Sequence, residues 1–116
     1  MNPFGMSGPA MKKMVENAQK QIAENAHKMQ ERLDAARLEG SSGGGMVKAT
    51  VSGSGNLIEV IIAPEAVDPS DVEMLQDLVV TAVREALEKA KEMQTDEQQK
   101  ILPGNLNIPG LGNLGL

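Results

Sequence analysis

Few side chains in this 116-residue chain could perform catalysis or bind a metal. It has one histidine, His27, and no cysteine, which excludes disulfides, cysteine zinc sites, histidine metal clusters and thiol catalysis. The carboxylates Asp68, Asp71, Glu73 and Asp77 lie close together in the sequence, but helix-start chemistry explains the first two and the spacing is not that of an EF-hand. The composition argues against an enzyme, and we expect no metal, cofactor or small-molecule substrate.

The basic residues are the remaining candidates, because lysine and arginine bind phosphate groups. The net charge is -5, from 11 basic and 16 acidic residues. Residues 1–48 hold seven basic and five acidic residues (+2), and residues 49–116 hold four and eleven (-7). Surface charges are screened over about 10 Å at 0.1 M salt, so local charge decides where a phosphate-bearing ligand could bind. The candidate phosphate contacts are Lys12, Lys13, Lys20, Lys28, Arg32 and Lys48.

The same lysines also have a simpler interpretation. Glu16 precedes Lys20 by four residues, and Glu24 precedes Lys28 by four. Such pairs on a helix surface each contribute about 0.2–0.5 kcal/mol, so these residues could form a solvated face with weak ion pairs. Lys48 lies among apolar strand residues, where a lysine commonly protects a sheet edge. Both interpretations remain open at this point.

Most of these basic residues lie on a predicted helix from Pro9 to about Arg37, which has no interior glycine or proline. At about 100° per residue its apolar side chains fall in a stripe about 80° wide. About 28 helical residues span roughly 42 Å, too long to stay buried in so small a chain. We expect part of this helix to project or to pack along a second chain. The stripe, typical of a coiled-coil seam, consists of Met11, Val15, Ala18, Ile22, Ala26, Met29, Leu33 and Ala36.

Alternating apolar residues predict two half-buried strands at 47–52 and 57–62, joined by a hairpin turn at 53–56. Residues 38–42 are the candidate third strand, joined through the glycines at 43–45. A second helix is predicted from Val72 to about Gln98, after the capping residue Asp68. Its apolar face covers about half of its circumference, enough to contact both the sheet and another helix.

The chain is expected to form a symmetric homodimer. The seam on the first helix, the wide apolar face of the second helix and the open edges of a small sheet all favour oligomerisation. A symmetric dimer is the commonest closed assembly.

The expected organisation is a flexible head at residues 1–8, a folded domain that forms the dimer at residues 9–98 and a Gly/Pro/Leu-rich tail at residues 99–116. The tail is expected to be disordered, with peptide-like docking of its leucines on a partner as the alternative. No apolar run approaches the roughly 18 residues of a membrane span, and the start lacks a signal-peptide pattern. We therefore expect no membrane association and a cytoplasmic location.

The order of these segments resembles that of the YbaB/EbfC family of bacterial nucleoid-associated proteins over nearly the whole chain. The similar segments are residues 11–21, the strand GMVKATVSG at 45–53, residues 58–64, the helix segment MLQDLV at 74–79 and the Pro-Gly-rich end at 102–111. The resemblance implies an α+β fold in the order α-β-β-β-α, assembled as a tweezer-like homodimer. It also implies that the folded domain at residues 9–98 binds double-stranded DNA in the nucleoid and affects DNA conformation, and it implies no catalysis.

The resemblance supplies no short DNA-reading motif, so the candidate contacts remain those derived from charge. Non-specific phosphate contact is expected, because no set of base-reading side chains stands out. The alternative function is that of a dimeric scaffold or adaptor, which would bind another protein through its projecting helices and apolar tail.

Overall fold

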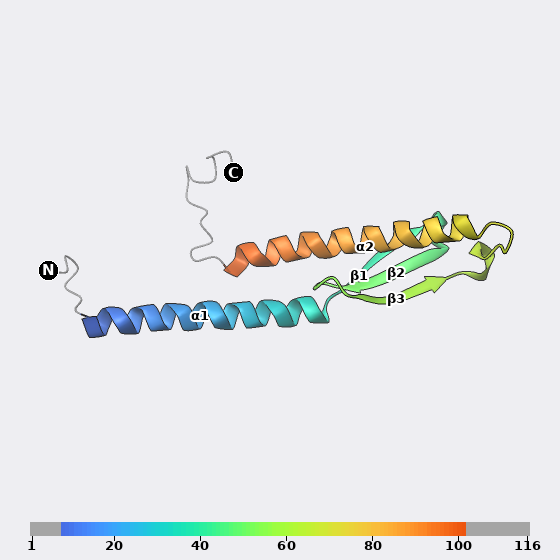
Figure 1. Cartoon of the computed structure of the whole chain (residues 1–116). Coiled ribbons are helices and arrows are strands. Elements are labelled where there is room, and N and C mark those ends of the chain that lie inside the picture. Colours follow the sequence, from blue (N-terminus) through green and yellow to red (C-terminus); the bar gives the residue numbers. More distant parts are fainter. Residues whose placement is uncertain (1–7, 102–116) are drawn as a thin grey trace, which may run out of the picture.

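The computed structural model describes residues 8–101 and shows two long helices and one small sheet (Figure 1). This arrangement confirms the predicted α+β fold, including the third strand. The flexible head and the disordered tail predicted from the sequence lie largely outside the described residues. In chain order the elements are α1 (Gly8–Ala35), β1 (Arg37–Ser42), β2 (Val47–Ser52), β3 (Leu57–Ile62) and α2 (Val72–Ile101), with short 3-10 turns at Gly43–Gly45 and Pro64–Ala66.

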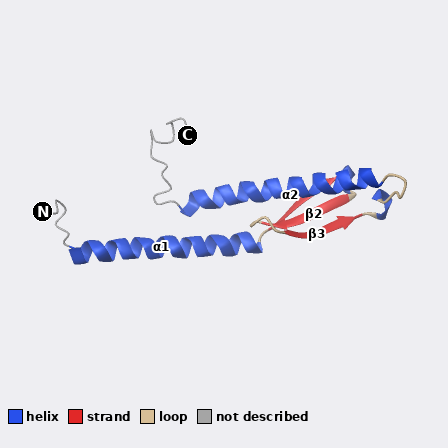
Figure 2. Ribbon diagram, viewed as in Figure 1, coloured by secondary structure: helices blue, strands red, loops and turns tan. Residues whose placement is uncertain are grey.

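Helix α1 projects from the rest of the protein, as Figure 2 shows. Near its C-terminal end Leu33 is buried, and Met29 and Ala26 are half-buried. Every residue from 8 to 24 is exposed, and this segment is termed the arm. The expectation that part of the first helix projects is therefore confirmed for the single chain.

The sheet is antiparallel, with strand order β1-β2-β3. The β1–β2 turn consists of three glycines, all with positive φ angles, from 59° at Gly43 to 93° at Gly45. Such a run of left-handed residues strongly favours glycine, which has no Cβ to clash. The β2–β3 turn is closed by the amide of Gly55, which donates to the carbonyl oxygen of Ser52 at 3.0 Å.

Helix α2 covers one face of β1 and β2. The core between them consists of small residues, because Val47, Ala49 and Val51 of β2 are fully buried together with alanines of α2. Alanines at 82, 86 and 90 repeat every four residues, so they lie on one side of the helix and allow the sheet to come close. Three hydrogen bonds to backbone carbonyl oxygens join α2 to the sheet and its turn: Ser42 Oγ to Leu78 (2.6 Å), Lys89 Nζ to Glu39 (2.7 Å) and Gln94 Nε2 to Gly53 (2.8 Å).

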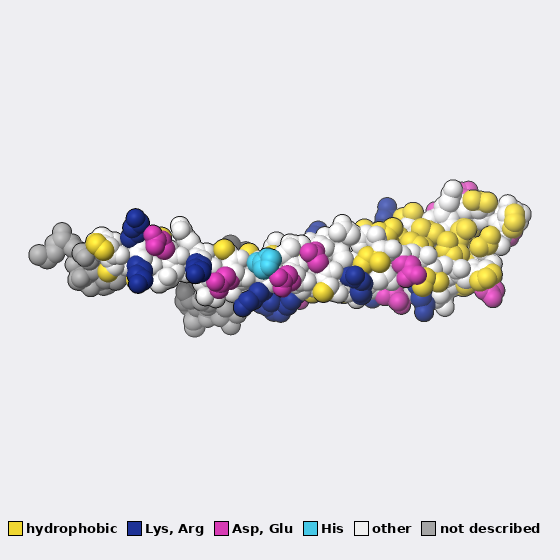
Figure 3. Space-filling model, turned by 90° about the horizontal axis from the view of Figure 1, so that it is seen from below, with side chains coloured by type: hydrophobic (Ala, Val, Ile, Leu, Met, Phe, Trp, Pro, Cys, Tyr) yellow, Lys and Arg dark blue, Asp and Glu magenta, His cyan; other side chains and the backbone are white. Residues whose placement is uncertain are grey.

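Strand β3 lies at the sheet edge and remains largely exposed. Val60 pairs with Ala49 and Ile62 with Val47, which places both on the face that carries the core. An irregularity beside Thr50 leaves Ile58 outside this pairing, so the alternation predicted for the strand does not extend to that residue. Exposed side chains of β3 contribute to the apolar surface that Figure 3 shows on the half of the chain that carries the sheet, and α2 also exposes large apolar side chains.

Within residues 8–101, neither helix contains a segment apolar enough to cross a membrane.

Candidate nucleic-acid interface

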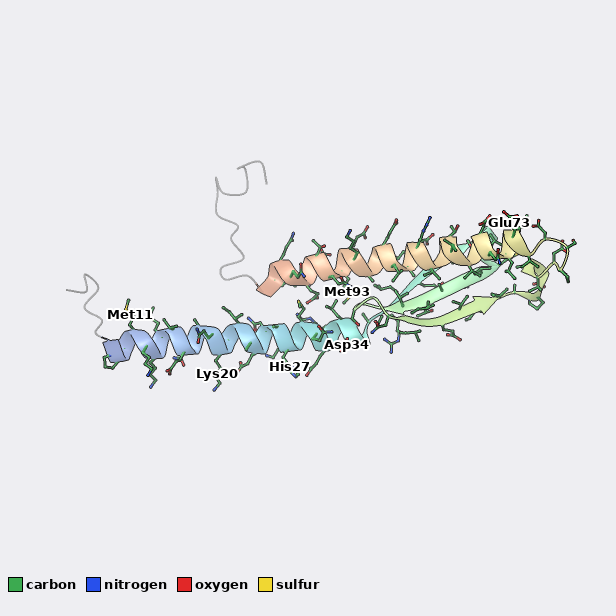
Figure 4. The ribbon with its side chains drawn as sticks, viewed as in Figure 1. Met11, Lys20, His27, Asp34, Glu73 and Met93 are labelled. Atoms are coloured by element: carbon green, nitrogen blue, oxygen red, sulfur yellow. The ribbon has the colours of Figure 1, made fainter. Side chains whose placement is uncertain are left out.

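The outer side of α1 carries the lysines Lys12, Lys13, Lys20 and Lys28, and all four are exposed. At about 100° per residue they occupy an arc of roughly 160° opposite the apolar stripe. Figure 4 shows Lys20 pointing away from α2, whereas Met11 points to the side on which α2 lies. Lys12 and Lys28 are separated by about 24 Å along the helix axis. These residues form an extended basic ridge, and the name lysine ridge is used for them below.

The lysine ridge is not neutralised by ion pairs. Among residues 8–101, none of its four lysines forms an ion pair, so the pairs expected from the Glu16 and Glu24 spacings do not form. A carboxylate on this face contacts the histidine instead, since His27 Nε2 lies 2.6 Å from Glu31. The arm itself carries three lysines and two glutamates. Its lysines therefore keep their charge available for another ligand.

Arg32, also a predicted contact, is held by α2. Its Nε and Nη2 both donate to Oε2 of Glu97, at 2.9 and 2.5 Å. Lys100 donates to the other carboxylate oxygen at 3.3 Å, and Glu97 is only 5% exposed. The hydrogen bond from Arg32 lowers the pKa of Glu97, burial opposes this effect, and the hydrogen bond from Lys100 adds to it.

This ion pair joins α1 to α2 at the base of the arm, and it was not predicted from the sequence. Glu97 lies 65 residues from Arg32, so no local spacing indicated the contact. The Arg32 side chain is about half exposed, so it can still approach a phosphate group. It would then bind the phosphate and Glu97 at the same time.

The structure places Lys48 apart from the lysine ridge. Its cross-strand neighbours are Ser41 and Ile61, and its side chain is exposed. Since α1 leads into β1 at Arg37, which pairs with Ser52, Lys48 lies at the end of the sheet away from α1. Lys48 and the ridge therefore belong to two separate surfaces of one chain.

The outer surface of α2 is acidic and offers no continuation of the ridge. Exposed carboxylates along it include Asp77, Glu85, Glu88 and Glu92. Such a surface repels phosphate groups. In Figure 3 the charged side chains spread along α1, whereas hydrophobic side chains gather over the sheet. In the described part of the chain no three His, Asp or Glu residues are placed to hold a metal ion.

Comparison with known proteins agrees with this architecture. The model of the YbaB/EbfC DNA-binding family matches residues 6–106. A nucleoid-associated protein of Clostridium acetobutylicum is 47% identical over 107 residues, covering 92% of this chain and 94% of that protein. One of Desulforamulus reducens is 51% identical over 106 residues, covering 91% and 99%.

The crystal structure of an uncharacterized protein from Helicobacter pylori superposes with a TM-score of 0.63 and 19% identity, covering 83% of this chain and 97% of that one. At this identity the likeness supports the fold alone. The family match confirms the resemblance seen in the sequence and agrees with the expectation that the chain is not an enzyme. The chain belongs to the YbaB/EbfC DNA-binding family.

Proposed function

We propose that the protein is a homodimeric nucleoid-associated protein that binds double-stranded DNA mainly through phosphate contacts and alters DNA conformation or nucleoid organisation. The observation that carries the proposal is the lysine ridge, which is exposed and has no carboxylate partner among the described residues. Membership of a DNA-binding family and the names of the relatives support the same function.

The main phosphate contacts are assigned to the four ridge lysines. Duplex DNA carries one negative charge per about 1.7 Å of its axis, so a ridge about 24 Å long can meet several phosphates. Arg32 and Lys48 are secondary contacts in this proposal, since Arg32 already binds Glu97 and Lys48 lies on another surface. The binding tolerates many sequences, because phosphate contacts carry no base information.

The dimer is supported by the apolar surface of the sheet half. On β3, Ile58, Ile61 and Ile62 are 47%, 52% and 38% exposed, and Val80 of α2 is 47% exposed. An unpaired sheet edge and so many exposed large apolar side chains are a liability in a monomer. A second copy would bury this surface and duplicate the ridge. Light scattering is expected to give twice the chain mass at micromolar concentration; a stable folded monomer would contradict this.

The test of the phosphate mechanism is a salt titration of affinity on unrelated duplexes. Each neutralised phosphate contributes about 0.9 to the slope of log affinity against log salt. Replacement of Lys13 and Lys20 by Gln removes two charges per chain and four per dimer, so the slope should fall by up to about 3.6. Fluorescence anisotropy with labelled duplexes measures the slope.

The matched control replaces Arg84 and Lys91 of α2 by Gln. These residues are exposed and form no ion pair among residues 8–101, so both double variants change the net charge equally. The control should keep the wild-type slope. An equal fall in both variants would mean that only total charge matters and would remove the ridge from the mechanism.

The effect on DNA shape has a separate test. Ligase-mediated closure of duplexes near the persistence length of about 150 base pairs should rise when the protein bends DNA. The ridge variant should lose this effect together with its affinity.

The nucleoid location is tested in cells. A fluorescent fusion of the protein is expected to coincide with the DNA stain, as a nucleoid location requires.

A further inference from the structure

The apolar stripe of α1 continues past the point at which α2 stops covering it. Leu33 is 4% exposed where the two helices meet, and Met29 is half-buried. Farther along the same face, Ile22 is 44% and Val15 is 51% exposed. The exposed part of the stripe lies in line with the covered part, so it faces the side of α1 from which α2 comes (Figure 4).

The end of α2 brings the chain to the edge of this uncovered stripe. The helices run in opposite directions, as Figure 1 shows, and Glu97 lies beside Arg32. Ile101 is four residues beyond Glu97 and Lys28 is four residues before Arg32, so α2 ends near the level of Lys28. From that level, Val15 is about 20 Å away along α1. The 15 residues that follow Ile101 could span up to about 50 Å.

The composition of this terminal segment suits the stripe and its borders. Residues 102–116 contain no charged side chain, and six of the 15 are leucine or isoleucine. The stripe is bordered by amides: Gln19 lies on one side, and Gln21 and Asn25 on the other. Gln21 donates a hydrogen bond to Asn25 at 3.2 Å along this border. Amide side chains can bind the peptide groups of an extended segment, and an uncharged segment needs no ionic partner there.

We propose that the C-terminal segment, residues 102–116, docks on the exposed apolar stripe of α1 of the same chain, with Val15, Ala18 and Ile22 as its main contacts. A second copy of α1 is the competing occupant. The terminal segment is favoured because it starts beside the stripe, and a short tether provides an effective concentration in the millimolar range. The lysine ridge lies on the opposite side of α1, so this docking leaves it open to DNA and does not depend on the DNA-binding proposal.

The experiment uses the absence of cysteine, which allows a single spin label at Gly112→Cys in the full-length protein. Isotope-labelled, spin-labelled chains are diluted into an excess of unlabelled, untagged chains. The amide signals of residues 15–22 are expected to broaden, and reduction of the nitroxide should restore them. The variant Val15→Gln/Ile22→Gln should lose the broadening, because glutamine keeps the helix but removes the apolar contact.

The matched control is Ala23→Gln, which adds glutamine to the outer face, where Ala23 lies beside Lys20 and His27. Its broadening should equal that of the wild type. In the reverse mixture, isotope-labelled untagged chains with unlabelled tagged chains, no broadening is expected. Broadening in that mixture would place the segment on another copy, and absence of broadening in both mixtures would leave the stripe to other occupants. Either result overturns the proposal.

Discussion

Replacement of Gly40 by alanine tests how closely β1 approaches α2. A Cβ atom built on Gly40 would lie 2.5 Å from the amide nitrogen of Ala86 and would also collide with the carbonyl oxygen of Ala82. Both contacts are with helix backbone, which has no rotamer that could relieve the overlap. Since ordinary contacts with a Cβ begin at about 3.4 Å, β1 would have to move from α2 by about 1 Å.

The cost follows from the core that this movement opens. Overpacking a well-packed core typically costs 1–3 kcal/mol of unfolding free energy. The Cβ added at Gly40 would clash with the backbone of α2, which cannot rotate away, so we expect a cost at the upper end of this range, about 3 kcal/mol. For a domain of this size that corresponds to a fall in melting temperature of roughly 12–24 °C. Thermal unfolding followed by circular dichroism measures the shift, at equal protein concentration because association also stabilises the fold.

Two glycines of the same chain provide controls. A Cβ at Gly44 meets nothing within 4 Å, but the φ angle of Gly44 is 69°. Gly44→Ala should therefore lower the free energy of unfolding only by the strain of an alanine in the left-handed region, roughly 1–2 kcal/mol. Gly8→Ala at the exposed start of α1 should leave the melting temperature unchanged or slightly higher. A Gly40→Ala protein that melts within a few degrees of the wild type would refute the close approach of β1 and α2.

Three further predictions concern the arm and the second basic surface. Glu97→Gln should lower the free energy of unfolding at pH 7, because Arg32 holds the pKa of Glu97 below its ordinary value. The loss of unfolding free energy relative to wild type should be complete above about pH 4.5 and should shrink as the pH falls through the lowered pKa. Denaturant titrations at several pH values measure this loss. Gly53→Ala places a Cβ 2.8 Å from the carbonyl oxygen of Leu33 and should shift the base of the arm, which would appear as a lower melting temperature and altered NMR signals there. Lys48→Gln should change the salt slope of DNA binding less than a single substitution in the lysine ridge.

The sequence predicts the elements of this fold well and their contacts poorly. The stripe from Met11 to Leu33 follows helical periodicity, and the turn at 53–56 has its own glycine signature, so both could be derived locally. The role of Gly40 could not be derived locally, because none of its neighbours in the sequence indicates that a helix backbone lies against it. The link between Arg32 and Glu97 likewise arises only when α1 and α2 lie side by side.

The candidate site shows the same division. Charge counts correctly separate a mildly basic first part from an acidic second part, but they treat Arg32 and Lys20 alike. The structure distinguishes these two residues, since Arg32 lies on the α2 side of the helix and is bound, whereas Lys20 points away from α2 (Figure 4). Local ion-pair rules also overstate the neutralisation of the ridge, because Lys20 and Lys28 form no ion pair among the described residues.

An acidic chain can present a basic ridge because its charges are separated in space as well as in sequence. The arm extends by about 25 Å along the axis of α1, more than twice the screening length of about 10 Å at 0.1 M salt. Carboxylates such as Asp77 and Glu85, on the part of α2 that covers the sheet, therefore act weakly on a phosphate at the end of the arm. The Arg32–Glu97 pair reinforces this separation, because it holds α1 against α2 at the base of the arm and leaves the lysines beyond it unpaired. In the proposed mode of binding, the projection of the arm, rather than the net charge of the chain, sets where DNA binds.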